Sequence, residues 1–142
     1  MEVSDVRRRL RAAIDRARQA ADERRTRTDA ALRDYEAFLL ERATPVFHQV
    51  AAALNAEGYG FKVFTPAGSI RLASDRSPDE AIEISLDTTS DPPSVVAHTT
   101  RGRGRRMIST ERVVGGAAPV ADLTEEDVLA LLLDEIVHLL GR

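Results

Sequence analysis

The sequence contains no cysteine and no long uncharged apolar run. Without cysteine there can be no disulfide bond, no thiolate metal site and no cysteine nucleophile. Residues 128–140 form the longest apolar stretch, but at about 13 residues, with Asp134, Glu135 and His138 inside it, this stretch is too short and too charged to span a bilayer. The first arginines are not followed by an apolar segment, so the start does not read as a signal peptide. We therefore expect a cytoplasmic protein without membrane contact.

A strong net charge is also lacking, since the formal charge is −3 at pH 7. This balance gives no general attraction to nucleic acid or to anionic lipid. With 142 residues, 43% of them hydrophobic and 30% charged, the chain has the composition of a folded protein that buries one core.

Glycine and proline are absent from the first 44 residues, where alanine and arginine dominate. Such a run predicts one continuous helix, about 60 Å long at about 1.5 Å per residue. A domain this small cannot cover so long a helix. We therefore expect residues 1–43 to form a projecting, helix-pairing element and residues 44–142 to form a compact α+β domain.

Apolar and small side chains recur at helical spacing along this first segment, in a stripe as narrow as the seam of a coiled coil. The expected helix-pairing interface consists of Val3, Val6, Leu10, Ile14, Ala17, Ala21, Thr28, Ala31, Tyr35 and Phe38. Arg24 and Thr28 interrupt the stripe, which should weaken its centre. Acidic residues four positions before an arginine support the helix without selecting a partner; these pairs are Asp5/Arg9, Glu23/Arg27 and Asp29/Arg33.

Thr44 and Pro45 resemble an N-cap followed by a first-turn proline, so either a second helix begins there or the long helix kinks. After Gly58 the apolar period changes to two, as in a sheet with one buried face. The strand candidates form a meander of four or five antiparallel strands, and lie around residues 61–63, 70–72, 82–86, 95–100 and 107–114.

The last segment predicts a helix over about 128–140, with Thr124 and Asp127 in a capping box. Apolar residues occupy more than half of its circumference, so the sheet, the second helix or another subunit must cover it. The expected fold is α+β, with the C-terminal helix packed on the sheet. Its expected core comprises Phe61, Val63, Ile70, Leu72, Ile82, Ile84 and Leu86 against Val50, Leu54, Leu131, Leu132, Ile136 and Leu139.

A basic segment lies near the tip of the last predicted hairpin. The candidate polyanion-binding residues are Arg101, Arg103, Arg105, Arg106 and Arg112. Arginine forks suit phosphate through bidentate contacts and counterion release. The segment holds no aromatic residue on which a base could stack. The alternative is a solvated turn, or one paired with the chain's own acidic residues.

Two weaker patterns involve histidine. His98, Glu83 and Ser85 could share the polar face of the sheet and supply the parts of a hydrolytic site, although polar residues gather on such faces anyway. Asp134 and His138 have the spacing of a metal pair, but the same spacing serves an ordinary pair near a helix C-terminus. We expect no catalytic residue, no metal site and no cofactor.

The function expected from the sequence is that of a non-catalytic interaction or adaptor module. It would assemble through its long N-terminal helix, with a second copy or with a partner helix. Nucleic-acid or other polyanion binding through residues 101–106 is the alternative.

Overall fold

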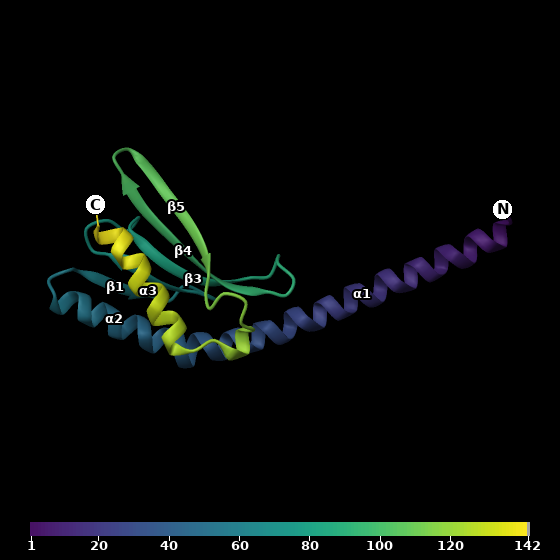
Figure 1. The fold of residues 1–142 in the computed structure, drawn as a ribbon, viewed down its shortest axis with the longest axis horizontal. Helices are drawn as coiled ribbons and strands as arrows, with labels where there is room; N and C mark the ends of the chain where they lie inside the picture. The colour runs from purple at the N-terminus through teal and green to yellow at the C-terminus, as the bar shows by residue number, and fades with distance from the viewer. Residues whose placement is uncertain (142) are drawn as a thin grey trace.

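The computed structural model describes residues 1–141, which form an α+β fold with a long N-terminal helix, a second helix, an antiparallel sheet and a C-terminal helix. Figure 1 shows the N-terminal helix leaving the rest of the molecule and ending far from it. The remaining elements form two layers, a helical layer and the sheet. The expected fold class is confirmed.

The N-terminal helix continues into the second helix through a widened turn. Helix α1 spans Val3–Phe38, a π-helical turn spans Leu39–Ala43, and α2 spans Thr44–Ala56. Thr44 has helical dihedral angles (φ −60°, ψ −48°), and its hydroxyl donates to the carbonyl of Leu39 at 2.7 Å. Thr44 is therefore not an N-cap. Proline has no N–H and collides with the carbonyl four residues before it, and a π turn accommodates both.

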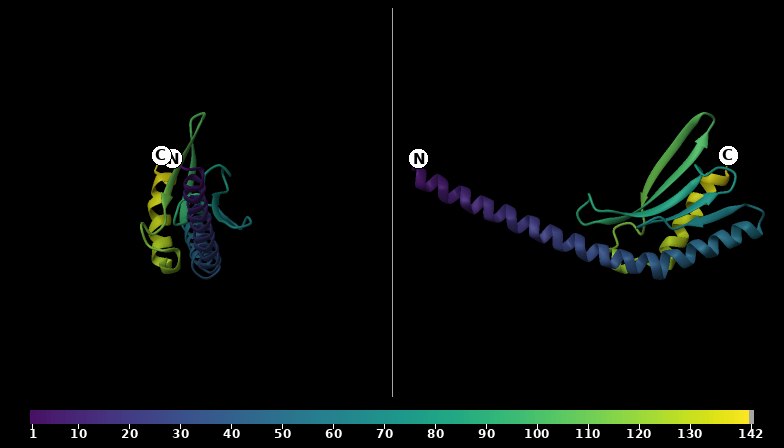
Figure 2. Two further views of the ribbon diagram at one scale, coloured as in Figure 1. Left: turned by 90° about the vertical axis from the view of Figure 1, so that its right-hand side faces the viewer. Right: turned by 180° about the vertical axis from the view of Figure 1, so that it is seen from behind.

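The two helices meet at a bend, which is visible in Figures 1 and 2. Of the two alternatives predicted at Thr44, the kink in a continuing helix is the one observed.

The sheet is a meander of five antiparallel strands within residues 1–141, as the alternation predicted. Its strands are β1 (Phe61–Phe64), β2 (Ile70–Ser74), β3 (Ala81–Asp87), β4 (Ser94–Arg103) and β5 (Arg106–Val113). Strand neighbours pair in sequence order, with Leu72 opposite Ile82 and Glu83 opposite His98. Ile82 and Ile84 are fully buried on one face, whereas Glu83 between them is only partly buried.

Strand β4 runs three residues further into the hairpin than the sequence predicted, and β5 begins one residue earlier. Arg103 pairs with Arg106, so the turn between the strands contains only Gly104 and Arg105. Gly104 has φ +64° at the first central position, where two-residue hairpins commonly need a glycine. Most of the basic segment therefore belongs to the paired strands and not to a loop. This segment is the end of a regular hairpin that extends past the C-terminal helix in Figure 1.

The C-terminal helix α3 spans Glu125–Leu140 and follows a short 3-10 helix, Val120–Asp122. The predicted capping box is confirmed, because the Asp127 N–H donates to the Thr124 hydroxyl and the Thr124 N–H donates to the Asp127 carboxylate. Within the connector before it, Gly115 has φ +71°, and an added Cβ would lie 2.3 Å from Leu123.

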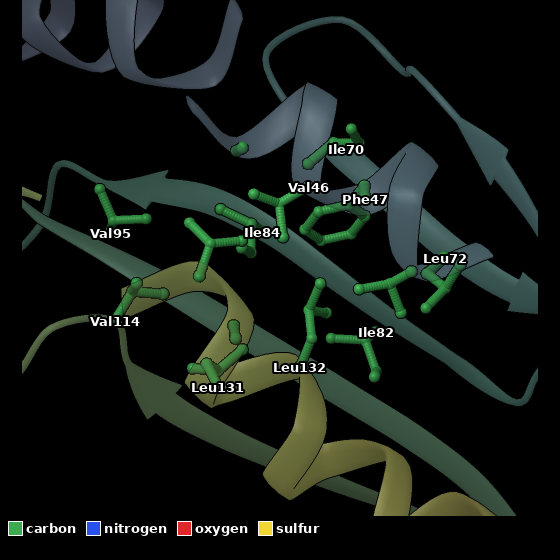
Figure 3. Close-up of a cluster of buried hydrophobic side chains, with 14 of the residues drawn as sticks. Val46, Phe47, Ile70, Leu72, Ile82, Ile84, Val95, Val114, Leu131 and Leu132 are labelled. Atoms are coloured by element: carbon green, nitrogen blue, oxygen red, sulfur yellow. The ribbon is translucent and has the colours of Figure 1, made fainter. Parts of the chain in front are cut away.

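Helices α2 and α3 bury one face of the sheet. Figure 3 shows Phe47 of α2 and Leu132 of α3 reaching toward Ile82 and Ile84 of β3. Most of the predicted core is buried as expected, while Val63, Leu86 and Leu54 are only partly buried at its margin.

The core also takes in the end of α1. Tyr35 and Phe38 are 3% and 0% exposed, with ring centroids 6.3 Å apart, and the Tyr35 hydroxyl donates to the Gly68 carbonyl at 2.7 Å. Burial, together with the negative charge of Glu83, raises the pKa of Tyr35 to about 12. Packing therefore does not follow the expected division at residue 43. The domain includes the last turns of α1.

Candidate interaction site

The distal segment of α1, residues 3–26, carries apolar side chains that its own chain leaves in solvent. Val3, Val6, Leu10 and Ile14 are 69%, 47%, 58% and 42% exposed. We call these four residues the apolar stripe. They lie on one side of the helix, because they are spaced by three or four residues. Ala17, the next member of the expected interface, is also exposed.

The C-terminal part of the expected helix-pairing interface is not available to a partner. Ala21, Thr28 and Ala31 are half-buried, and Tyr35 and Phe38 lie inside the core of the same chain. An aromatic pair enclosed in this way cannot also face a partner helix. As members of a helix-pairing interface, Tyr35 and Phe38 are therefore corrected to core residues.

An ion pair marks the point where α1 leaves the domain. The Arg27 guanidinium contacts the Asp91 carboxylate through two hydrogen bonds, Nε to Oδ1 at 3.1 Å and Nη2 to Oδ2 at 2.8 Å. The hydrogen bond from Arg27 holds the pKa of Asp91 below its usual value. Arg27 was expected to pair with Glu23, but the loop between β3 and β4 supplies its acid instead.

Ion pairs along the distal segment are local. Asp5 pairs with both Arg8 and Arg9, the second as predicted, and Asp22 pairs with Arg25. Such exposed pairs support helicity weakly and leave the other arginines of the segment in solvent.

The five arginines proposed for polyanion binding separate into two groups. Arg112 donates to Glu135 at 3.2 Å and to Asp134 at 3.4 Å, and Arg101 donates to the His138 carbonyl at 3.0 Å. The hydrogen bond with Glu135 raises the pKa of Arg112. These two arginines therefore bind the chain's own α3.

Arg103, Arg105 and Arg106 remain exposed at the hairpin tip, and no ion pair involves them within residues 1–141.

A polar hollow of about 310 Å³ lies between the β4–β5 hairpin and α3. Thr99, Arg112 and Glu135 line it, and Glu135 is only 3% exposed. The contact with Arg112 explains the buried carboxylate, because a buried charge needs a hydrogen-bonded partner. The hollow therefore lies where the β4–β5 hairpin packs against α3, and the Arg112–Glu135 contact joins the two elements.

None of the hollows described for residues 1–141 is lined by all three residues considered for hydrolysis. Glu83 lies opposite His98, but the His98 imidazole contacts Glu111 at 3.1 Å, and Glu83 lies 3.9 Å from Arg71. Ser85 lines a separate hollow beside Tyr35 and α1. Within the described residues, no group of three or more His, Asp or Glu side chains is placed to hold a metal ion.

One surface was missed by the sequence analysis. A groove of about 410 Å³ runs between α2 and α3, and we call it the α2–α3 groove. Its apolar lining residues are Val46, Val50, Ala53, Leu54, Leu129, Leu133 and Ile136. Leu133 is 53% exposed. The sequence pattern that could have predicted this groove is the wide apolar face of the last helix. The sheet covers only part of that face.

Comparison with family models, with curated proteins and with solved structures found no match. Any function must therefore be inferred from the surfaces of this chain. Among residues 1–141, none of the helices combines the length and the apolar character that crossing a membrane requires.

Proposed function

We propose that this protein is a non-catalytic interaction module that assembles through the distal segment of α1. The observation that carries the proposal is the apolar stripe, four large side chains left 42–69% exposed on a helix that has already left its domain. Contiguous apolar surface of this kind on a small protein marks an interaction site.

The energetics indicate an exchangeable complex. Full burial of a valine, leucine or isoleucine side chain stabilises by roughly 1.5–3 kcal/mol, and partly exposed side chains gain less. Association itself costs roughly 4–15 kcal/mol. Four such side chains in each of two copies exceed this cost only modestly, so we expect a concentration-dependent dimer.

Sedimentation equilibrium tests the proposal directly. The double substitution Leu10→Asp/Ile14→Asp places two carboxylates in the stripe, and it should convert the dimer to a monomer. The matched control, Ala12→Asp/Gln19→Asp, adds the same charge on the opposite side of the same helix. It should leave the dimer intact.

Circular dichroism of both variants establishes that α1 is still helical. A monomeric parent protein, or equal dissociation of the two variants, would contradict the proposal.

Polyanion binding is the second candidate, supported by the three exposed arginines at the hairpin tip. It predicts salt-sensitive retention on immobilised heparin, because each anionic contact with an arginine releases counterions. Arg103, Arg105 and Arg106 changed together to alanine should elute at much lower salt.

The distal segment is also rich in arginine, so it supplies the control. Changing Arg11, Arg16 and Arg18 to alanine removes the same charge elsewhere. If this variant loses as much retention as the hairpin variant, retention reflects total charge and the second candidate falls.

A further inference from the structure

The α2–α3 groove has an acidic rim on an apolar floor. Glu57 just after α2 and Glu125 and Glu126 at the start of α3 line it together with Gln49 and the seven apolar residues. No lysine or arginine is among the described residues that line it. Its occupant should therefore be apolar along its centre and positively charged along its sides.

The distal segment of α1 has this character. Its apolar stripe is flanked by arginines on both sides, among them Arg7 and Arg11 on one side and Arg9 and Arg16 on the other, from the 100° helical step. Residues 3–18 contain six arginines and two aspartates. Six minus two gives a formal charge of +4 opposite the three glutamates of the groove.

The lengths also agree. The groove is lined from Val46 on α2 to Glu57 just after it, and from Glu125 to Ile136 on α3. The stripe runs from Val3 to Ile14. Each of these three intervals is 11 residue steps, or about 16 Å of helix. The whole stripe therefore fits along the groove, as an amphipathic helix lies between two others.

The stripe cannot occupy the groove of its own chain. Helix α1 is unbroken from Val3 to Phe38, and Ile14 lies about 20 Å beyond Arg27 along the helix. Figure 1 shows the N-terminus directed away from both α2 and α3. A stripe that fills the groove must therefore come from another molecule.

We propose that the α2–α3 groove of one copy binds the apolar stripe of a second copy, reciprocally, so that each domain holds the other's N-terminal helix. Two copies exchanging the same pair of surfaces form a closed dimer. This inference rests on the proposed function, since it names the surface that the distal segment of α1 pairs with.

Single cysteines test the contact, because the chain has none of its own. Leu10→Cys lies in the stripe and Ala53→Cys lines the groove. The two full-length variants, one of them isotope-labelled, are mixed and oxidised, and the products are identified by mass. A disulfide forms only where Cα atoms come within about 7 Å, so we expect about tenfold more mixed product than in the controls.

In two matched controls, each cysteine is placed at a nearby residue that lies outside the stripe or outside the groove. Ala12→Cys lies away from the stripe on the same helix, and Ala52→Cys is exposed on α2 but does not line the groove. A dominant disulfide between two Leu10→Cys chains would overturn the groove as receptor while leaving the proposed function standing. A monomer that gives no specific cross-link would overturn both.

A second pair of variants needs no oxidation. Leu133→Glu adds a charge to the groove, whereas Val137→Glu adds the same charge four residues along α3, at a side chain that is 67% exposed and does not line the groove. We expect the first to weaken dimerisation about tenfold or more and the second to leave it unchanged. Equal effects would overturn the inference.

Discussion

The exposed and the buried parts of the helical run from α1 to α2 have different surroundings. Residues 3–26 extend into solvent with Leu10 and Ile14 exposed, whereas Tyr35, Phe38 and Phe47 on the following turns are buried. Helical propensity and local ion pairs suffice to specify the first half as a helix. The second half differs from the first in its tertiary contacts. These contacts attach it to the domain.

Truncation should give the largest difference in stability between the exposed and the buried part of the helix. Removing residues 1–26 leaves the core intact, so below the dimerisation range we expect the same midpoint of urea unfolding as for the full chain. Removing residues 1–43 takes Tyr35, Phe38 and Ala43 out of the core. Each aromatic contributes roughly 3–5 kcal/mol, which together rivals the whole stability of a small domain, so this chain should not fold. A folded 44–142 chain would restore the boundary expected from the sequence.

A single core substitution sharpens the same contrast. Phe47→Ala creates a cavity at a side chain with 0% exposure and should lower the free energy of unfolding by roughly 3–5 kcal/mol. Leu10→Ala, on the exposed part of α1, should change it by less than about 0.5 kcal/mol below the dimerisation range. Urea unfolding measures both, and comparable losses would show that the stripe is packed within its own molecule.

Tyr35 gives the buried half a pH dependence. Its pKa is about 12 in the folded chain and 10 as the ordinary value, so the folded state keeps its proton longer. Stability from this group is therefore complete below pH 10 and is lost as the pH rises from about 10 to 12, by roughly 2–3 kcal/mol. Tyr35→Phe loses the bond to Gly68, about 1 kcal/mol near neutral pH, but should lack this alkaline decline. Identical profiles for the two proteins would contradict the assignment.

Arg112 tests whether the hairpin is held to α3 or free. Arg112→Met leaves the buried carboxylate of Glu135 without the partner 3.2 Å away, and should destabilise by about 2 kcal/mol. Arg105→Met, at the exposed turn, should have no measurable effect. Should both prove neutral in thermal unfolding, the contact with α3 is dispensable.

The smallest effect concerns the junction between the halves. Asp91→Asn removes the charge that Arg27 contacts at the domain's edge. Both side chains are about half exposed, so the unfolding midpoint should not move measurably. Amide hydrogen exchange around residues 24–28 should become faster than in the parent protein, because the helix loses a tether there. Unchanged exchange would show that packing alone fixes the junction.

Local patterns predicted most of the elements. The absence of glycine and proline predicted α1, alternation predicted the meander, and Thr124 with Asp127 predicted the start of α3. These features depend on neighbours within a few residues, which a sequence displays directly.

Features that depend on distant residues were not predictable in the same way. Tyr35 continues the stripe by spacing alone, and its burial depends on the approach of β3 and of Gly68. The partners of Arg112 lie 22 and 23 residues away along the chain. The α2–α3 groove exists only because two helices far apart in sequence pack side by side. The stripe itself was found because it lies on one helix.

The orientation of α1 at Arg27 determines the position of its N-terminus. A straight helix attached at one end magnifies rotation, so a tilt of about 10° at Arg27 displaces Val3, about 36 Å away, by about 6 Å. That sweep is comparable to the spacing between neighbouring side chains on a helix. A surface ion pair that contributes little to folding stability can therefore influence the direction in which the distal segment of α1 points.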